Sequence, residues 1–159
     1  MDGTRYRVTS SARVAAPAER VYRILADYRS GHPNILPAAF RNFVVEAGGV
    51  GAGTLTRFDV RAFGRTQSFR HEVLEPEPGR VLVERDRDLD SRTTFTVEPA
   101  GAESIVTIST EATSRPGVAG RVERWLSTRF LTGLYGEELA KLDAFARMGP
   151  NSLGQVDSR

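Results

Sequence analysis

Polar and apolar residues alternate along most of the chain. Over residues 5–14, three arginines share one set of alternate positions, and Tyr6, Val8 and Val14 occupy the other. A period of two with one charged face is typical of a strand that is solvated on one side. Similar patterns recur over residues 40–47, 53–63, 65–75, 80–85, 92–98 and 103–113. Because glycines or prolines separate several of these segments, the sequence predicts six to seven antiparallel strands, most of them joined by hairpins.

Two segments have helical periodicity instead. Residues 116–148 carry apolar side chains at spacings of three and four, which predicts one long helix near the C-terminus. A short helix is predicted over residues 17–26, where Pro17 suits a first turn. Residues 27–37 contain two prolines and a glycine, so they predict a turn or a second small helix. This order of elements indicates an α+β fold.

The long helix has apolar residues on two different faces. Val118, Val122, Trp125 and Leu126 cluster on one side, at 100° per residue. A second set clusters on nearly the opposite side: Leu131, Leu134, Tyr135, Leu139, Leu142 and Phe145. A straight helix on one sheet cannot bury both sets, so we predict a kink or break between about residues 127 and 136. The second half would cover the sheet, and the first half would border a cavity mouth or a partner.

Composition narrows the class of protein. The 159 residues predict a single domain over residues 1–148 and a tail over 149–159. With no cysteine and two histidines, we expect neither a disulfide nor a metal site, and no motif calls for a cofactor. The net charge of +2 is too small to favour nucleic acid. Since no apolar run is long enough to span a bilayer, we expect a cytoplasmic protein without stable membrane insertion.

Four short motifs occur in a recognisable order. Residues 11–22 form a strand ending in Ala-Pro, followed by Glu-x-Val-Tyr, and Asp27-Tyr28 precedes Leu36-Pro37. A Val-Gly-x-Gly sequence spans residues 50–53, and a Thr-Phe-Thr-Val-Glu-Pro sequence spans residues 94–99. Together they resemble the START-like, Bet v1-like helix-grip superfamily (SRPBCC), in its bacterial polyketide cyclase/dehydrase and lipid-transport branch. The resemblance covers roughly residues 5–147.

The resemblance implies a helix-grip fold and a small-molecule ligand. A curved antiparallel sheet of six to seven strands would wrap around the C-terminal helix, with two short helices after the first strand. The cavity between sheet and helix would hold a hydrophobic or aromatic, lipid- or polyketide-like molecule. Many members have a tryptophan just before the proline at position 37, whereas this chain has Ile35-Leu36. This sequence is more similar to that of the coenzyme-Q-binding relatives, so a coenzyme-Q-binding-like carrier is a further alternative.

In such a fold, the inward side chains of the strands and of the first half of the long helix determine the ligand. The expected ligand-binding residues are Phe58, Val60, Phe69, Val83, Phe95, Ile108, Thr110, Trp125 and Leu126. The competing interpretation is that these side chains fill a solid core.

Two residues are candidates for catalysis. His71 shares a face with Phe69 and could act as a general acid or base, or it could be an inert buried histidine. Arg85, expected on the face of Val81 and Val83, could hold a carboxylate or enolate oxygen, or it could lie in solvent.

Three classes of function therefore remain open. The first is a carrier of a hydrophobic small molecule, and the second is a polyketide cyclase or dehydratase that uses acid–base chemistry. The third is an interaction protein with a filled core. Whether the chain forms a homodimer is also open, because no residue pattern decides it.

Overall fold

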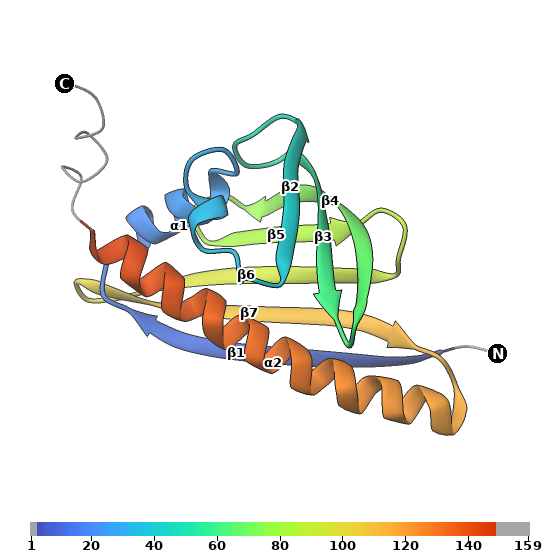
Figure 1. Ribbon diagram of the computed structural model, residues 1–159. Helices are drawn as coiled ribbons and strands as arrows, with labels where there is room; N and C mark the ends of the chain where they lie inside the picture. The colour runs from blue at the N-terminus through green and yellow to red at the C-terminus, as the bar shows by residue number, and fades with distance from the viewer. Residues whose placement is uncertain (1–2, 149–159) are drawn as a thin grey trace.

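The computed structural model describes residues 3–148, which form a seven-stranded sheet curved around one long helix (Figure 1). The elements in chain order are β1 (Thr4–Val14), α1 (Ala18–Ala26), the 3-10 helix η1 (His32–Asn34), β2 (Phe40–Ala47), β3 (Leu55–Ala62), β4 (Arg65–Glu77), β5 (Val81–Asp86), β6 (Ser91–Ala100), β7 (Glu103–Ser114) and α2 (Gly117–Arg147). The predicted α+β helix-grip fold is confirmed. The predicted tail, residues 149–159, lies outside the described residues.

The sheet is antiparallel throughout, with the strand order β1-β7-β6-β5-β4-β3-β2. Strands β2 to β7 follow one another as hairpins, whereas β1 pairs with β7, the last strand. Strands β1 and β2 therefore lie at opposite edges of the sheet. The segment between them, which holds α1 and η1, must cross from one edge to the other, and it covers one end of the sheet (Figure 1).

The core lies between the concave face of the sheet and the two α-helices. Alternate strand positions supply fully buried apolar side chains, among them Val73, Leu82, Phe95, Val97, Val106 and Ile108. The helices contribute Val21 and Leu25 from α1, and Leu139 and Leu142 from α2. Each such buried side chain contributes about 1.5–3 kcal/mol of transfer free energy. This burial fixes which residues of each strand point inward.

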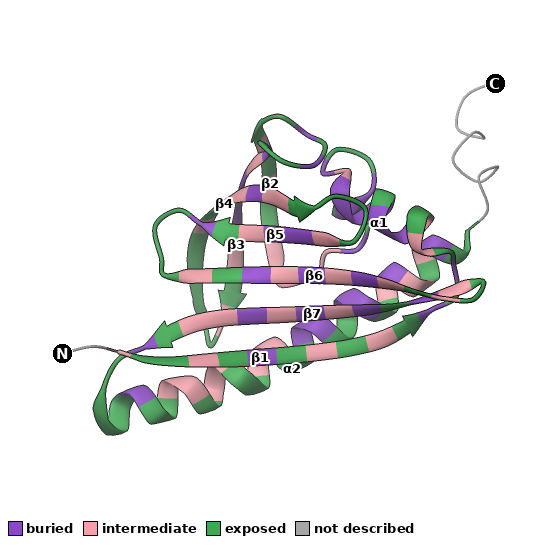
Figure 2. Ribbon diagram, turned by 180° about the vertical axis from the view of Figure 1, so that it is seen from behind, coloured by how far each residue is buried: buried purple, intermediate pink, exposed green. Residues whose placement is uncertain are grey.

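Helix α2 is one uninterrupted α-helix, so the predicted break between residues 127 and 136 is wrong. Gly133 and Gly136 remain helical within it. The two apolar faces are reconciled because only the second one packs on the sheet. Leu139 and Leu142 are buried, whereas Val118, Val122 and Trp125 are 67%, 52% and 59% exposed. Figure 2 shows the first turns of α2 as mostly exposed or half-buried.

Because only the second half of α2 packs on the sheet, shortening a side chain should lower stability more in the second half than in the first. Leu139→Ala should lower the free energy of unfolding by about 2–5 kcal/mol, since it leaves a cavity in the core. Val122→Ala, the matched truncation of an exposed apolar residue, should change it by less than about 0.5 kcal/mol. Urea denaturation followed by circular dichroism measures both. Equal losses would mean that the first half of α2 is packed in solution.

Candidate ligand pocket and acid–base cluster

A pocket of about 550 Å³ opens between strand β2 and the segment that follows α1. Its lining residues are Tyr28, Arg29, Pro33, Leu36, Pro37, Ala38, Phe40, Phe43 and Val45. Most of these side chains are apolar, and the volume lies within the range of small-molecule sites. The expected cavity lay between the sheet and the C-terminal helix, and this pocket lies to the side of that position. Helix α2 instead supports the pocket wall, because Lys141 Nζ donates to the Leu36 carbonyl oxygen at 2.9 Å.

A β-bulge gives the pocket its aromatic wall. In a regular strand, Phe40 and Phe43 would point to opposite faces, because they are three residues apart. Between them the register with β3 shifts, and Asn42 adopts a positive φ of 54°. Both phenyl rings then lie against Phe58 of β3, with ring centroids 5.0 and 6.3 Å away. Bulges of this kind often redirect side chains at sheet edges.

The Phe58 ring separates the pocket from the half-buried His71. It stacks on Phe69 at a centroid distance of 5.6 Å and makes an edge contact with His71 at 4.8 Å. The pocket wall, this aromatic layer and His71 therefore follow one another in space.

His71 lies between two carboxylates on the neighbouring strand. Its Nδ1 is 3.5 Å from Glu84 Oε2, and its Nε2 is 3.5 Å from Asp86 Oδ2. The pairing of β4 with β5 places His71 opposite Asp86, so both side chains point to the same face. Asp86 Oδ1 also accepts hydrogen bonds from the backbone N–H groups of Asp88 and Leu89, each at 2.8 Å.

These contacts set the charges of the three groups. Burial lowers the pKa of the His71 imidazole, but Asp86 and Glu84 outweigh burial and raise the pKa to about 9. Burial raises the pKa values of Glu84 and Asp86, yet His71 and their other hydrogen-bond donors lower both below the ordinary values. At neutral pH the arrangement is thus one imidazolium between two carboxylates.

Glu84 also connects this ion pair to the pocket. The Tyr28 hydroxyl donates to Glu84 Oε1 at 2.8 Å, and Tyr28 itself lines the pocket. Its ring stacks on His32, with centroids 4.5 Å apart. The His32 Nδ1–H donates to the Leu25 carbonyl oxygen at 2.8 Å, which leaves Nε2 to face Glu84 Oε1 at 3.6 Å.

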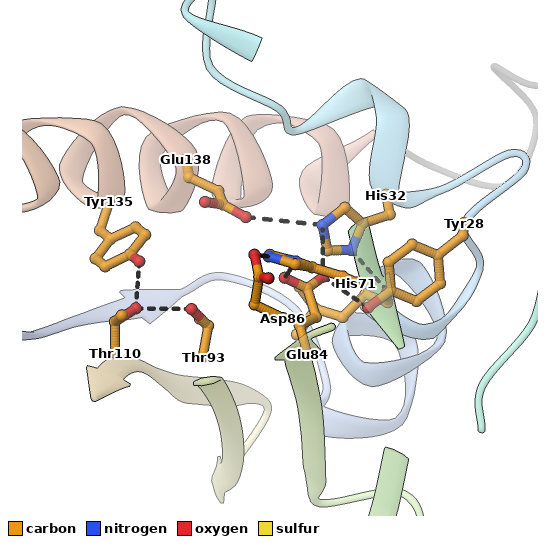
Figure 3. Close-up of polar contacts among 10 residues, drawn as sticks. Tyr28, His32, His71, Glu84, Asp86, Thr93, Thr110, Tyr135 and Glu138 are labelled. Carbon is orange, nitrogen blue, oxygen red and sulfur yellow. Dashed lines mark hydrogen bonds and ion pairs between the residues drawn. The ribbon is translucent and has the colours of Figure 1, made fainter. Parts of the chain in front are cut away.

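Glu138 of α2 completes the group from the opposite side (Figure 3). The residue is 3% exposed, and its Oε1 lies 3.9 Å from His32 Nε2. Burial, assisted by the negative charge of Glu84, raises the pKa of Glu138 well above its ordinary value. We call His32, His71, Glu84, Asp86 and Glu138 the acid–base cluster. It combines ionised carboxylates with a carboxyl group that favours its neutral form.

A chain of hydroxyl groups lies beside this cluster. Thr93 Oγ1 and Thr110 Oγ1 are 2.7 Å apart, and Thr110 also hydrogen bonds to the Tyr135 hydroxyl (Figure 3). Burial raises the pKa of Tyr135 to about 12, helped by Glu138 and Glu84 and opposed by the two threonine hydroxyls. Tyr135 is therefore a neutral hydrogen-bonding group.

The structure places the predicted residues in several different environments. Phe58, Phe69 and His71 lie in or behind the aromatic layer, on the inward face, while Phe95 and Ile108 belong to the packed core. Val60 is half-buried on β3, and Thr110 joins the hydroxyl chain. Trp125 is exposed on α2 and Leu126 is half-buried there, apart from the residues that line the pocket.

The inward orientation expected for Val83 and Arg85 is wrong. Strand β5 turns Leu82, Glu84 and Asp86 inward, because Leu82 pairs with the core residue Phe95 and Asp86 pairs with His71. Val83 and Arg85 therefore lie on the other face. The Arg85 guanidinium donates to Glu72 at 2.6 Å, and its side chain is 52% exposed.

None of the pocket-lining residues was predicted as a site residue from the sequence, and neither were four residues of the acid–base cluster: His32, Glu84, Asp86 and Glu138. A one-residue error in the orientation of β5 accounts for Glu84 and Asp86, since it exchanges the two faces of the strand. Glu138 had a usable signal, because it is four residues from both Leu134 and Leu142 on the buried stripe of α2.

Neither a metal site nor a membrane-spanning helix is found among residues 3–148. No group of three or more His, Asp or Glu side chains there is arranged to hold a metal ion. Within the same residues, no helix is both long and apolar enough to cross a membrane.

The curved sheet around a long C-terminal helix, together with the adjoining pocket, defines a protein of the START-like, Bet v1-like class. Residues 5–147 match the family described as polyketide cyclase / dehydrase and lipid transport, and the chain belongs to this family. That membership associates the chain with hydrophobic ligand binding or polyketide cyclase-type function. No curated protein matches it significantly.

Solved structures agree with this assignment. The KanY protein superposes with a TM-score of 0.82 at 25% identity, over 91% of this chain and 99% of its own. The Zhui aromatase/cyclase from Streptomyces sp. R1128 gives 0.71 at 19% identity, over 90% and 94%. A START superfamily protein from Mycobacterium smegmatis gives 0.65 at 21% identity, over 86% and 92%. The latter two likenesses bear on the fold alone.

The geometry around His71 predicts an unusual titration. Nuclear magnetic resonance of the two histidines should show His71 titrating near pH 9, and His71→Gln assigns its signal. Asp86→Asn should lower this pKa by about one unit or more, because it removes one of the two facing carboxylates. Glu72→Gln is the matched control, since Glu72 adjoins His71 in sequence but pairs with Arg85 on the other face.

The same titration has a consequence for stability. The folded-state pKa of His71 lies above the ordinary value of 6.5, so protonation stabilises the fold fully below pH 6.5. This contribution is lost as the pH rises through about 9. A His71 signal that titrates near 6.5, or one unaffected by Asp86→Asn, would contradict the arrangement.

Proposed function

We propose that this protein binds a hydrophobic or aromatic small molecule in the pocket between β2 and the segment after α1. The observation that carries the proposal is the 550 Å³ pocket with its aromatic wall. Phe40, Phe43 and Val45 offer apolar surface to a ring or an acyl chain, while Tyr28 and Arg29 are the polar side chains of the lining. A mostly apolar wall with few polar groups is the usual composition of such sites.

A ligand there would lie close to the acid–base cluster. Tyr28 belongs to both, since it lines the pocket and its hydroxyl reaches Glu84. Movement of the Phe58 ring would bring His71 next to the ligand as well. A lipid- or polyketide-like molecule with a carbonyl or hydroxyl group has polar atoms that suit this side of the pocket.

A second candidate function is that of a polyketide cyclase or dehydratase, and the protonation pattern of the cluster favours it. Acid–base enzymes often hold neighbouring carboxyl groups in opposite protonation states. Here Glu84 is held ionised, and Glu138 is held toward its neutral form. One group is thus prepared to accept a proton and the other to donate one.

Dehydration of a β-hydroxy ketone illustrates the chemistry. Ionised Glu84 would take the proton from the carbon between the two oxygen functions, and neutral Glu138 would protonate the departing hydroxyl group. The electrons of the broken C–H bond form the new carbon–carbon double bond, and water leaves. The step needs no oxidant or reductant.

Binding is tested by closing the pocket. Ala38→Phe places a ring on an exposed lining position and should weaken binding of an apolar fluorescent probe, such as anilinonaphthalene sulfonate, by about tenfold or more, since the ring fills the pocket. Ala102→Phe is the matched control, because Ala102 is exposed in the turn between β6 and β7. Native mass spectrometry of protein purified from its own host would give the mass of a retained molecule. A carrier of coenzyme-Q type would be recognised by that mass. Equal probe binding by both variants would refute the pocket.

Catalysis is tested separately from binding. With a poly-β-keto thioester as substrate, Glu84→Gln and Glu138→Gln should each lower kcat by about 100-fold or more while the probe still binds, because they remove the proposed base and the proposed acid. Arg85→Gln should retain wild-type turnover, because Arg85 points away from the cluster. Chromatography coupled to mass spectrometry follows the loss of water. Binding without any turnover would leave the carrier function and exclude the enzyme.

A further inference from the structure

The first half of α2 presents apolar side chains to solvent. Val118, Val122 and Trp125 are all more than half exposed. Leu126 and Phe130 continue the row in half-buried positions, and Phe130 meets Phe63 of the β3–β4 turn at a ring-centroid distance of 5.8 Å. Phe63 is itself exposed. Residues 118, 122, 126 and 130 follow at intervals of four, so they form one continuous strip along the helix.

Arginines flank this strip. At 100° per residue, Arg121 and Arg129 project on the same side as Val118 and Trp125. The Arg129 guanidinium lies over the Trp125 ring, 5.2 Å from its centroid. In sequence, residues 115–129 contain four arginines and a single acid, Glu123, which pairs with Arg115. We call Val118, Arg121, Val122, Trp125 and Arg129 the docking face.

We propose that the docking face binds the surface of an anionic lipid membrane. Exposed valines and a tryptophan among arginines are the composition of helices that lie in the headgroup region. The apolar side chains would enter that region, and Arg121 and Arg129 would contact the lipid phosphates. Contact is peripheral and does not cross the bilayer. The proposal is independent of the proposed function, because the pocket lining contains no residue of this face.

A second copy of the chain fits this face less well. In a two-fold symmetric dimer, the same patch meets itself. Arg121 and Arg129 would then approach arginines of the other copy, with no acid of the same face to neutralise them. An anionic lipid surface instead supplies the opposite charge and an apolar layer together.

Trp125 is the only tryptophan in the sequence, so its fluorescence reports directly on this face. Vesicles of phosphatidylcholine with phosphatidylglycerol should shift its emission to the blue and sediment with the protein. Vesicles of phosphatidylcholine alone should do so at least about tenfold more weakly, and added salt should weaken the anionic binding. Val118→Ser/Val122→Ser and Arg121→Glu/Arg129→Glu should each reduce sedimentation with anionic vesicles by about tenfold or more.

Arg41→Glu/Arg87→Glu is the matched control, because it changes the net charge equally at exposed positions of other elements. It should retain most of the binding, and circular dichroism should show that all variants are folded. Binding that is equal for neutral and anionic vesicles, or unaffected by the face variants, would overturn the proposal. Absence of vesicle binding would also overturn the proposal. If light scattering then shows a dimer that the Val118→Ser/Val122→Ser variant abolishes, the face binds a second copy instead.

Discussion

The interior of this protein depends on the ion pairing of His71 with Glu84 and Asp86. Burying a carboxylate without a partner is strongly unfavourable, and this sheet buries two on adjacent inward positions of β5. The imidazolium between them compensates their charge, and the Tyr28 hydroxyl and two backbone N–H groups add hydrogen bonds. Burial, assisted by the negative charge of Glu84, drives Glu138 toward the neutral form. The protonated His71 thus helps to keep its two neighbouring carboxylates ionised, and the ionised Glu84 in turn favours the neutral form of Glu138.

The same interaction explains how far sequence reasoning could go. Alternation and turn residues predicted the strands to within about two residues, because a sheet with one buried face imposes a period of two. The bounds of β5 were predicted equally well, but its orientation was not. Its Val81-Leu82-Val83 run is apolar at consecutive positions, so the pattern did not say which face is buried. Either orientation places charged side chains inward, Arg85 in one case and Glu84 with Asp86 in the other. The deciding partner, His71, lies on another strand.

The long helix illustrates a different limit. Its two apolar faces were read correctly, but the assumption that both must be buried was not valid, and it led to a break that the structure does not have. Large apolar side chains are usually buried, yet helical periodicity cannot distinguish an apolar stripe that faces the core from one that faces solvent. The pocket could not be predicted from the alternation of residues either, since it depends on the bulge at Asn42 that brings Phe40 and Phe43 to one side.

The pairing of β1 with β7 has a consequence for the order of folding. Thr4 lies opposite Ser114, so the first strand finds its partner only after most of the chain has been synthesised. Contacts this distant in sequence carry a high loop-closure entropy and are associated with slow folding. Glu138 follows still later in the chain. Before β7 is synthesised, β6 therefore has an unpaired edge. Until α2 follows, the charged groups of β4 and β5 are not yet covered by Glu138 and its helix. Unpaired strand edges that are exposed for this long are prone to aggregate, so the topology favours slow synthesis or protection of the nascent chain.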